Sequence, residues 1–528
     1  MQNYDTIIIG AGSAGCVLAN RLSADPNRSL LLVESGSSNY HPLLQVPAGW
    51  ASTFRNSKFD WGYSTDSEQE LHGRKVYWPR GRVLGGSSSI NGMIYIRGIP
   101  ADFDRWTQVG AVGWDYSDVL PYFRKAEAQE RCMDEYHGHE GPLHVQDVRD
   151  RRKADDFFLK GMNEIGIPRN DDFNGEKQAG CGYYQLTQRN GRRWSAANAY
   201  LDPVKNRPNL HIRTRTTAQR ITFNDRTVKG VVLSNAKQGD YEVGARQVII
   251  SAGSVNSPQL LELSGIGNAS RLQGLGIKVL MDQPEVGENL QDHLMTKVVY
   301  GTLKSNSINR EVLGWRLLPT SIRWLLFRSG ALTNGSATAG GFWFSRRGLV
   351  APDIQIHFAS GATLHNNKGR IRALDSPAIT AVVGQSRPES TGSVHITKNR
   401  ANVPPLIKAN YLSSEIDRRT LVDGLRLLIK IFESKSMSSV VTRRVSPQIN
   451  IDSDTELLDY IRSDAITSYH PTSTCRIGSV VDNDLRVYGV HGLSVVDASI
   501  MPYVVSGNTN AATIMIAEKA ANKHLEIR

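Results

Sequence analysis

The sequence predicts an α/β fold that contains a Rossmann-like dinucleotide-binding domain. Two observations near the start of the chain carry this prediction: a glycine-rich turn separates a β-branched run from a helix-favouring run, and the next apolar run ends in an acidic residue. The length of 528 residues exceeds the ~100–200 residues of a typical domain, so we expect two domains, contiguous or interleaved. Hydrophobic residues make up 40% and charged residues 21%, which excludes a disordered, fibrous or coiled-coil protein.

The first strand is expected at Thr6 to Ile9 and the first helix at Cys16 to Leu22, with the pattern G-x-G-x-x-G between them. Gly10 permits the tight turn, Gly12 lets backbone N–H groups approach a pyrophosphate, and Gly15 allows close helix packing. The N-terminus of the following helix stabilises anionic phosphates. The pattern therefore favours adenine-dinucleotide binding, by FAD or NAD, over a glycine turn that serves helix packing alone.

The second strand is expected at Leu30 to Val33. It ends at Glu34, nineteen residues after Gly15. An acidic side chain at this place suits a ribose diol and disfavours the 2′-phosphate of NADP.

Several later segments resemble the signatures of the glucose-methanol-choline (GMC) oxidoreductase family. Residues 81–98 read GRVLGGSSSINGMIYIRG, and residues 253–267 read GSVNSPQLLELSGIG. The stretch PEVGENLQDH at 284–293 and the C-terminal segments 468–478 and 497–520 extend the resemblance over essentially the whole chain. It implies an α/β (α+β overall) flavoenzyme, in which a Rossmann-like FAD-binding domain is interleaved with a substrate domain built on a largely antiparallel sheet with helices.

The resemblance also implies domain bounds and FAD contacts. We expect the FAD-binding domain at 1–154, 206–299 and 461–528, and the substrate-binding domain at 155–205 and 300–460. Members with a covalent flavin link have a histidine directly before the matching asparagine, whereas this chain has Ile90, so we predict non-covalent FAD. The expected FAD contacts are Gly10, Gly12, Ser13, Ala14, Gly15, Glu34, Val83, Gly86, Asn91, Gly92, Met93, Ile94, Ala218 on the adenine side, Asp497, Ala498, Asn508, Thr509 and Asn510.

Two residues of the C-terminal block match the family's catalytic pair, His470 and Asn508. An alcohol gives up a hydride readily only as its hydroxyl proton is removed, and imidazole, with a pKa near ~6.5, suits that task. We expect His470 to act as the base and Asn508 to donate its amide N–H to the developing alkoxide, with hydride transfer to flavin N5. Asn510 is an alternative to Asn508, or a second flavin contact.

The expected substrate is an uncharged primary alcohol, an aromatic hydroxymethyl compound or a polyol, oxidised to the aldehyde or ketone. Choline-oxidising members carry an acid shortly before a G-G-F segment, where this chain has Thr338, so choline is disfavoured. Tyr469 and Thr338 are the candidate substrate contacts. Choline dehydrogenase activity and a redox-neutral hydroxynitrile lyase activity on the same fold are the alternatives.

The remaining histidines are expected to be structural. His137, His139 and His144 lie within eight positions and suggest a metal site, but similar turns occur in the family without metal, so we predict none. For His293, at the end of a family motif, we favour a structural role over a catalytic one.

Outside the motifs, periodicity predicts further elements. We expect strands at Ala378 to Val383 and Ser393 to Thr397, and an amphipathic helix at Glu415 to Glu433. A proline-interrupted apolar stretch at 312–327 is expected to form a core or lid helix, with an interfacial helix as the alternative. The aromatic stretch 40–65 is expected to be a lid over the pocket or a covered surface loop.

Composition limits the partners. The formal net charge is +11, but the densest basic run, 149–153, has no nucleic-acid motif beside it, so we expect no nucleic-acid partner. Four cysteines without C-x-x-C spacing, and the lack of a secretory signal pattern, predict a cytoplasmic location. No transmembrane helix is expected, and membrane contact is expected to be at most peripheral, to the inner membrane. The expected electron acceptor is oxygen or a quinone-type compound.

Overall fold

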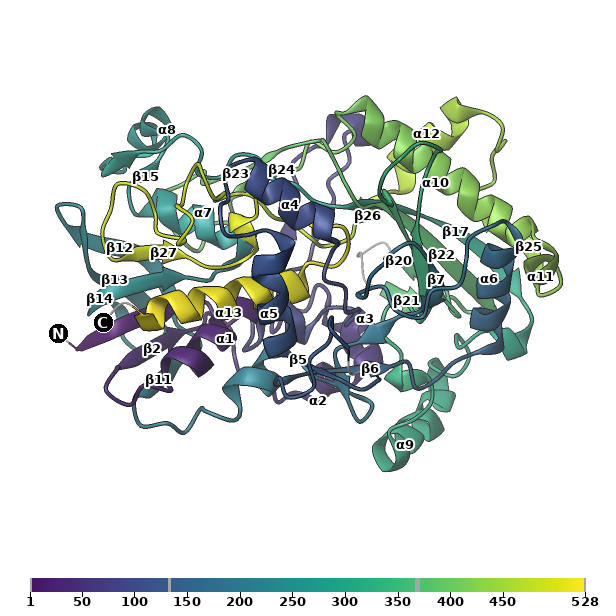
Figure 1. The fold of residues 1–528 in the computed structure, drawn as a ribbon, viewed down its shortest axis with the longest axis horizontal. Helices are drawn as coiled ribbons and strands as arrows, with labels where there is room; N and C mark the ends of the chain where they lie inside the picture. Colours follow the sequence, from purple (N-terminus) through teal and green to yellow (C-terminus); the bar gives the residue numbers. More distant parts are fainter. Residues whose placement is uncertain (1, 132–133, 366–370, 527–528) are drawn as a thin grey trace.

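A computed structural model describes residues 2–131, 134–365 and 371–526. Two seven-stranded sheets lie at opposite ends of the molecule (Figure 1). Further elements lie outside these two sheets: α2 (Pro42–Gln45), α3 (Trp50–Thr53), β3 (Tyr63–Ser64), β4 (Tyr77–Trp78), α4 (Pro100–Gln108), α5 (Tyr116–Ala126), β5 (Glu127–Gln129), β6 (Leu143–Asp147), β8 (Gln185–Leu186), β9 (Gln188–Arg189), β10 (Arg192–Arg193), β15 (Ile266–Gly267), α8 (Ala269–Gly274), β16 (Met281–Asp282), β20 (Thr363–His365), β21 (Ile371–Ala373), β23 (Ser393–His395) and β24 (Leu406–Lys408).

The first sheet is parallel in its centre and antiparallel at one edge. Its order is β11 (Leu210–Arg213), β2 (Leu30–Val33), β1 (Asn3–Ile9), β14 (Gly239–Ile250), β13 (Thr227–Asn235) and β12 (Thr217–Asn224), with β27 (Leu493–Val495) beside β14. Strand β2 is buried and apolar throughout, and β1 and β14 end in the buried apolar runs 7–9 and 248–250, as expected where a sheet is covered on both faces. Helices α1 (Ser13–Leu22) and α13 (Asn510–Glu526) pack against each other beside it (Figure 1).

The second sheet is antiparallel throughout. Its order is β25 (Val441–Ser446), β17 (Leu294–Thr302), β22 (Ala378–Gln385), β19 (Ile354–Ala359), β18 (Ala339–Trp343) and β7 (Gly180–Tyr183), with β26 (Ile466–Thr467) beside β17. Helices α6 (Lys153–Glu164) and α10 (Glu415–Glu433) contact these strands, with α11 (Lys435–Ser438) and α12 (Asp454–Asp464) beyond. The predicted α/β fold with a largely antiparallel second sheet is confirmed.

The predicted helix and strand bounds agree closely with the structure where the hydrophobic periodicity of the sequence is clear. The helix at Glu415–Glu433 and the strand at Leu30–Val33 have the expected bounds, and strands begin at Ala378 and Ser393 as expected. Within stretch 40–65, short helices lie between residues 42 and 53, residues 63–64 form β3, and 54–62 is a loop. The predicted domain boundary at 299/300 falls inside β17, and β26 lies in a segment assigned to the FAD-binding domain. Strand β17 pairs only with strands of the second sheet, so the chain has already left the first sheet before Leu294.

Candidate active site

A cavity of about 840 Å³ extends from the glycine-rich turn of the first sheet to the strands of the second. Its volume is at the upper end of the ~300–1,000 Å³ usual for ligand pockets, as a large cofactor together with a substrate requires. Helix α7 (Gly253–Leu263) and the loop before α13 contribute to the same wall. The cavity therefore joins the two candidate sites that the motifs predict.

Three helices point their N-termini at one end of this cavity. The first residues of α1, α7 and α13, namely Ser13, Gly253 and Asn510, all line it. The Ser13 hydroxyl donates to Asn510 Oδ1 at 2.7 Å and so ties the first helix to the last. Unpaired N–H groups and the helix dipoles make this end attractive to a pyrophosphate. The residues present thus fit the anionic part of FAD.

The turn requires glycine at these positions for two different reasons. A Cβ at Gly10 would lie 2.4 Å from the carbonyl oxygen of Ser251, and one at Gly15 would lie 1.8 Å from that of Gly10, so packing of the chain requires both. At Gly12 a Cβ would meet only Ser251, at 4.0 Å, and Gly12 lines the cavity. Protein packing does not explain this glycine, whereas a ligand lying against the main chain does.

Glu34 lines the cavity at the end of β2. Its carboxylate accepts hydrogen bonds from the backbone N–H groups of Ala11 (3.0 Å) and Gly36 (2.8 Å), which fix its orientation. Burial raises the pKa of Glu34 to about 7. The carboxylate keeps lone pairs for a ribose diol.

Most of the expected FAD contacts line the cavity, but two do not. Gly15 is a packing residue, and Val83 is buried in a small apolar cluster with Leu44, Phe59 and Ile90. The loop that carries Asn91 is held by Arg193, a residue that no motif indicated, whose Nη1 donates to Asn91 Oδ1 at 2.8 Å. The expected contacts on the wall are Gly10, Gly12, Ser13, Ala14, Glu34, Gly86, Asn91, Gly92, Met93, Ile94, Ala218, Asp497, Ala498, Asn508, Thr509 and Asn510.

Thr338 does not reach the cavity, in contrast to its expected role as a substrate contact. Its hydroxyl donates to Asp155 Oδ1 at 2.9 Å, and the residue is buried. The four residues before it, 334–337, line the cavity instead, and the Thr338 side chain is the first that turns away towards Asp155. Tyr469 does line the cavity, and its ring packs edge-on against Phe54, with ring centres 5.3 Å apart.

His470 is held rigidly from its backbone. Its N–H donates to Asp292 Oδ1 at 2.7 Å, and the other oxygen of Asp292 accepts from Thr467 and Tyr411. The preceding residue, Tyr469, has a left-handed φ of +68°, and its carbonyl accepts from Arg80 Nη2 at 2.6 Å. A non-glycine residue adopts this conformation at a cost, which these contacts offset. The imidazole therefore has one fixed position on the cavity wall.

The proton on the His470 ring can be placed from its neighbours. His293 Nε2 lies 3.1 Å from the carbonyl oxygen of Ser386, which can only accept, so this nitrogen carries the hydrogen. In the neutral ring of His293, Nδ1 is then an acceptor, and it lies 3.0 Å from Nδ1 of His470. His470 therefore donates from Nδ1 and keeps an unprotonated Nε2. We expected a structural role for His293, yet it fixes the tautomer of the catalytic candidate.

Asn508 lies next to that free nitrogen. Its Nδ2 is 3.1 Å from His470 Nε2, and its Oδ1 accepts from Gln355 Nε2 at 3.1 Å, which orients the amide with its N–H groups towards His470. Burial, and then the charges of His293 and Arg80, lower the pKa of His470 well below its ordinary value. The pair therefore presents a neutral base and an N–H donor to one point of the cavity. The side chain of Asn510 instead accepts a hydrogen bond from Ser13.

The end of the cavity beside the second sheet (the sheet end) has buried polar groups without partners in the described part of the chain, and no sequence motif indicated them. His357 on β19 and Thr380 on β22 line it, and neither Nδ1 of His357 nor the Thr380 hydroxyl has a partner among the described residues. Burial lowers the pKa of His357 to about 4, so this ring is neutral near pH 7. Both groups are available to a polar group on a substrate.

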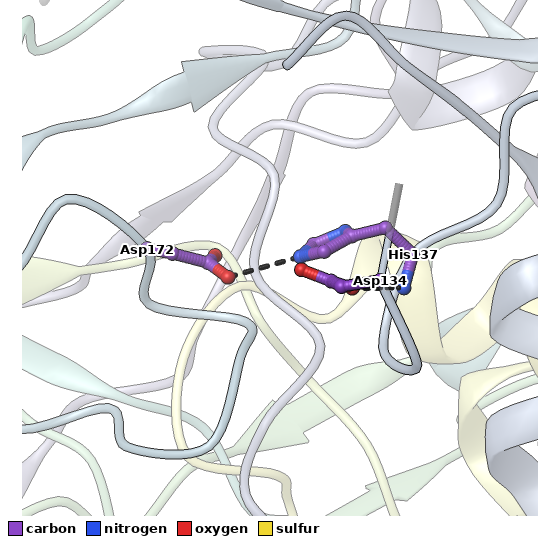
Figure 2. Close-up of side chains that lie close together, drawn as sticks. All are labelled: Asp134, His137 and Asp172. Atoms are coloured by element: carbon purple, nitrogen blue, oxygen red, sulfur yellow. Dashed lines mark hydrogen bonds and ion pairs between the residues drawn. The ribbon is translucent and has the colours of Figure 1, made fainter. Parts of the chain in front are cut away.

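The histidine-rich turn forms an ion-pair network (Figure 2). Asp134, His137 and Asp172 place ligand atoms within 4.8 Å of one another, which is compatible with a metal. However, both ring nitrogens of His137 are engaged, with Glu127 at 3.1 Å and Asp172 at 2.9 Å. Against the effect of burial, these carboxylates raise the pKa of His137 to about 9. The resulting imidazolium has no lone pair for a metal, so nothing here favours a metal over the ion pairs.

The whole chain has relatives of known activity. Residues 4–295 and 388–517 match the two family models described as GMC oxidoreductase. The mitochondrial choline dehydrogenase of Mus musculus is 39% identical over 534 residues, covering 99% of this chain and 89% of the relative. The alcohol dehydrogenase (acceptor) of Pseudomonas putida is 41% identical over 529 residues, covering 98% and 95%. Among solved structures, pyridoxine 4-oxidase from Mesorbium loti matches with a TM-score of 0.90 and 31% identity, over 99% of both chains.

Proposed function

This chain belongs to the GMC oxidoreductase family, and from that premise we propose that it oxidises an uncharged alcohol. It is a flavin-dependent oxidoreductase that acts on CH–OH groups, and FAD is its cofactor. We propose a primary alcohol, an aromatic hydroxymethyl compound or a polyol as the substrate, with the aldehyde or ketone as the product.

The arrangement of His470 and Asn508 carries this proposal. Their ring and amide nitrogens are 3.1 Å apart on the cavity wall. A substrate hydroxyl beside both would donate its proton to the unprotonated Nε2 of His470 while its oxygen accepts from the Asn508 amide. His470 then holds the proton, and Asn508 stabilises the charge that develops on the oxygen. FAD, when bound in this cavity, supplies the hydride acceptor at flavin N5.

We propose non-covalent attachment of the cofactor. Ile90 is buried in the apolar cluster beside Leu44 and offers no nucleophile for a link to the flavin. The main chain of the glycine-rich turn, the three helix N-termini and Glu34 would hold FAD by hydrogen bonds and dipoles alone.

The charges around the cavity favour an uncharged substrate over choline. Among the described residues of its wall, the acidic ones are Glu34 and Asp497, and Asp497 accepts from Gly253 and Ser257 at the cofactor end. The sheet end instead has Lys297, whose ammonium pairs with Asp464 at 3.2 Å. A quaternary ammonium would meet aromatic rings there, such as Phe54, but no carboxylate.

Choline oxidation remains the second candidate, because a choline dehydrogenase is among the relatives at 39% identity. A redox-neutral lyase reaction, which would use His470 as a base without reducing the flavin, is the third.

An anaerobic flavin-reduction screen distinguishes these candidates. We expect benzyl-type alcohols or polyols to bleach the flavin, and 3,3-dimethylbutan-1-ol to do so more readily than choline, its isostere with a charged nitrogen. Faster bleaching by choline would replace our substrate proposal with the choline one. If no alcohol bleaches the flavin while a mandelonitrile-type substrate is cleaved, the oxidation proposal fails.

Air exposure of the reduced enzyme then tests the acceptor. We propose oxygen or a quinone-type compound, and fast reoxidation in air favours oxygen.

We also propose a cytoplasmic location, which the buried free thiols Cys16, Cys181 and Cys475 suit.

A further inference from the structure

Helix α9 (Leu317–Phe327) exposes an unusual amount of apolar surface. Trp315 just before it is 78% exposed, and within it Leu318, Leu325, Leu326 and Phe327 are each 61–70% exposed. Single exposed apolar residues are common, but a contiguous group of this kind marks an interaction surface. Figure 1 shows α9 projecting from the edge of the molecule. Of the expected core or lid helix, the core position is therefore wrong, whereas a lid and an interfacial helix are both compatible with this exposure. Pro319 lies in the first turn, where the missing N–H costs no hydrogen bond, so the helix continues.

The helix stands between the cavity and the exterior. Trp324 is its one buried residue, and the indole N–H donates to the carbonyl oxygen of Gly191 at 2.9 Å. Leu317 and Ser321 line the cavity from the helix, and Leu313 does so from the segment before it. One side of α9 thus closes the cavity while the opposite side is exposed.

Basic residues surround the exposed apolar side chains. Residues 312–330 include Arg316, Arg323 and Arg328 and no acidic residue. The hairpin β9–β10 adds the exposed Arg189 and Arg192. A Cβ added at Gly191, in the turn of this hairpin, would lie 2.5 Å from the carbonyl oxygen of Arg328, so the hairpin packs against the end of the helix. Guanidinium groups bind phosphates well, and a short helix with apolar residues, tryptophan and arginine is typical of the membrane interface.

We propose that α9 and Trp315 dock on the surface of an anionic lipid bilayer. The apolar side chains would lie among the lipid headgroups, and the arginines would contact the lipid phosphates. With 11 residues, α9 is about 16 Å long, far short of the ~30 Å hydrocarbon core. Among the described residues, no helix is long and apolar enough to cross a membrane. The docking is therefore peripheral.

Charge favours a bilayer over a second copy of this chain. In a two-fold dimer through α9 the same patch would face itself, so arginines would oppose arginines with no acid between them. An anionic bilayer complements both the apolar and the basic parts. In the docked state, apolar alcohols or electron acceptors dissolved in the lipid could reach the cavity past Leu313 and Leu317.

Vesicle sedimentation of the FAD-loaded enzyme tests the docking. We expect binding to vesicles of equal parts phosphatidylglycerol and phosphatidylcholine to be at least about tenfold tighter than to pure phosphatidylcholine, since each basic residue near an anionic surface contributes about fivefold. High salt should weaken it. Flavin absorbance in the pellet reports binding independently of turnover, so failure of docking and failure of the proposed oxidation are distinguishable.

Two variants make the test specific to the helix. Leu325→Glu combined with Leu326→Glu removes exposed apolar contacts, and neither residue lines the cavity. We expect vesicle affinity to fall about tenfold or more, with unchanged turnover of a short water-soluble alcohol. Val112→Glu, at a 66% exposed residue between α4 and α5, is the matched control and should bind like the unaltered protein.

Three outcomes would overturn the proposal. The unaltered protein could stay in the supernatant with anionic vesicles, or the double variant could bind as tightly as the control. Alternatively, sedimentation velocity could show a dimer that the double variant dissociates while no vesicle binding occurs, which would assign the helix to a second copy of the chain.

Discussion

The cofactor end of the cavity is walled mainly by main chain, whereas the sheet end is walled by side chains. At the first end, glycines and helix N-termini present N–H groups, and added atoms at Gly10 or Gly15 would overlap the backbone. At the second end, strands β17, β19 and β22 present side chains such as Met295, His357 and Thr380. A main-chain wall recognises a constant ligand and tolerates little change. A side-chain wall can be altered for new substrates without disturbing the fold.

Removing the base should produce the largest effect on chemistry and none on the cofactor end. We expect His470→Ala to slow flavin reduction by about 10²–10⁴-fold, because general-base assistance is lost, while the flavin content stays the same. Stopped-flow absorbance under anaerobic conditions measures the rate. His357→Ala is the matched control: it changes another cavity histidine and should raise KM more than it slows reduction. Loss of FAD from His470→Ala would show that the two ends are not independent.

Gly12→Ala tests the main-chain wall. The added methyl group meets no protein atom closer than 4.0 Å, so the melting temperature of the apoprotein should not change. It would intrude on the ligand, and we expect FAD binding to weaken about tenfold or more, a typical cost of one or two kcal/mol for overpacking. Fluorescence titration with FAD measures this. Gly15→Ala should instead destabilise the protein itself, since its Cβ would lie 1.8 Å from Gly10 O. Equal FAD affinity in Gly12→Ala would contradict the proposed pyrophosphate position.

His293→Asn tests the positioning of His470. We expect kcat to fall about tenfold, the effect of a weakened hydrogen bond that fixes the tautomer. Repulsion between the two rings when both carry an extra proton is one of the causes that lower the pKa of His470, so removal of His293 raises that pKa. Because the base works only when unprotonated, the acidic limb of the kcat profile should move to higher pH. If His293 had a purely structural role, the variant would have a lower kcat at every pH, and the acidic limb of the kcat–pH profile would not shift.

Thr380→Val should give the smallest effect. The hydroxyl is buried without a partner, so valine removes an unsatisfied group and leaves stability equal or slightly higher. If a polar group of the substrate uses this hydroxyl, KM for a diol should rise by about fivefold, equivalent to about 1 kcal/mol. KM for the mono-alcohol of the same length should not change. An equal rise for both alcohols would indicate a change of shape rather than a lost hydrogen bond.

Sequence patterns predicted the main-chain end better than the side-chain end. The turn around Gly12 and the acid at Glu34 are local, so a short window contains the whole geometric requirement. His470 and Asn508 were identified through family motifs. Gln355 and His293, which orient them, lie 153 and 177 residues away in sequence and belong to strands or motifs with no chemical signature of their own.

Thr338 shows the limit of position-by-position transfer. The expected substrate contact lies one residue from the cavity-lining Ala337, and its side chain points to Asp155. One residue here separates the cavity wall from a side chain buried against Asp155, so an alignment uncertain by one position loses the site. For the stretch that forms α9, the sequence left a core or lid helix and an interfacial helix open, because an apolar run has the same pattern in a core and at an interface.

The hydrogen bond between Ser13 and Asn510 joins two segments that are 497 residues apart in the sequence. Domains generally fold during synthesis from the N-terminus, but here the helix that begins at Asn510 belongs to the phosphate-binding end built around α1. Strand β1 must likewise wait for its neighbour β14, about 240 residues later. The nascent chain therefore cannot complete the wall of this cavity until the segment that carries Asn510 has left the ribosome.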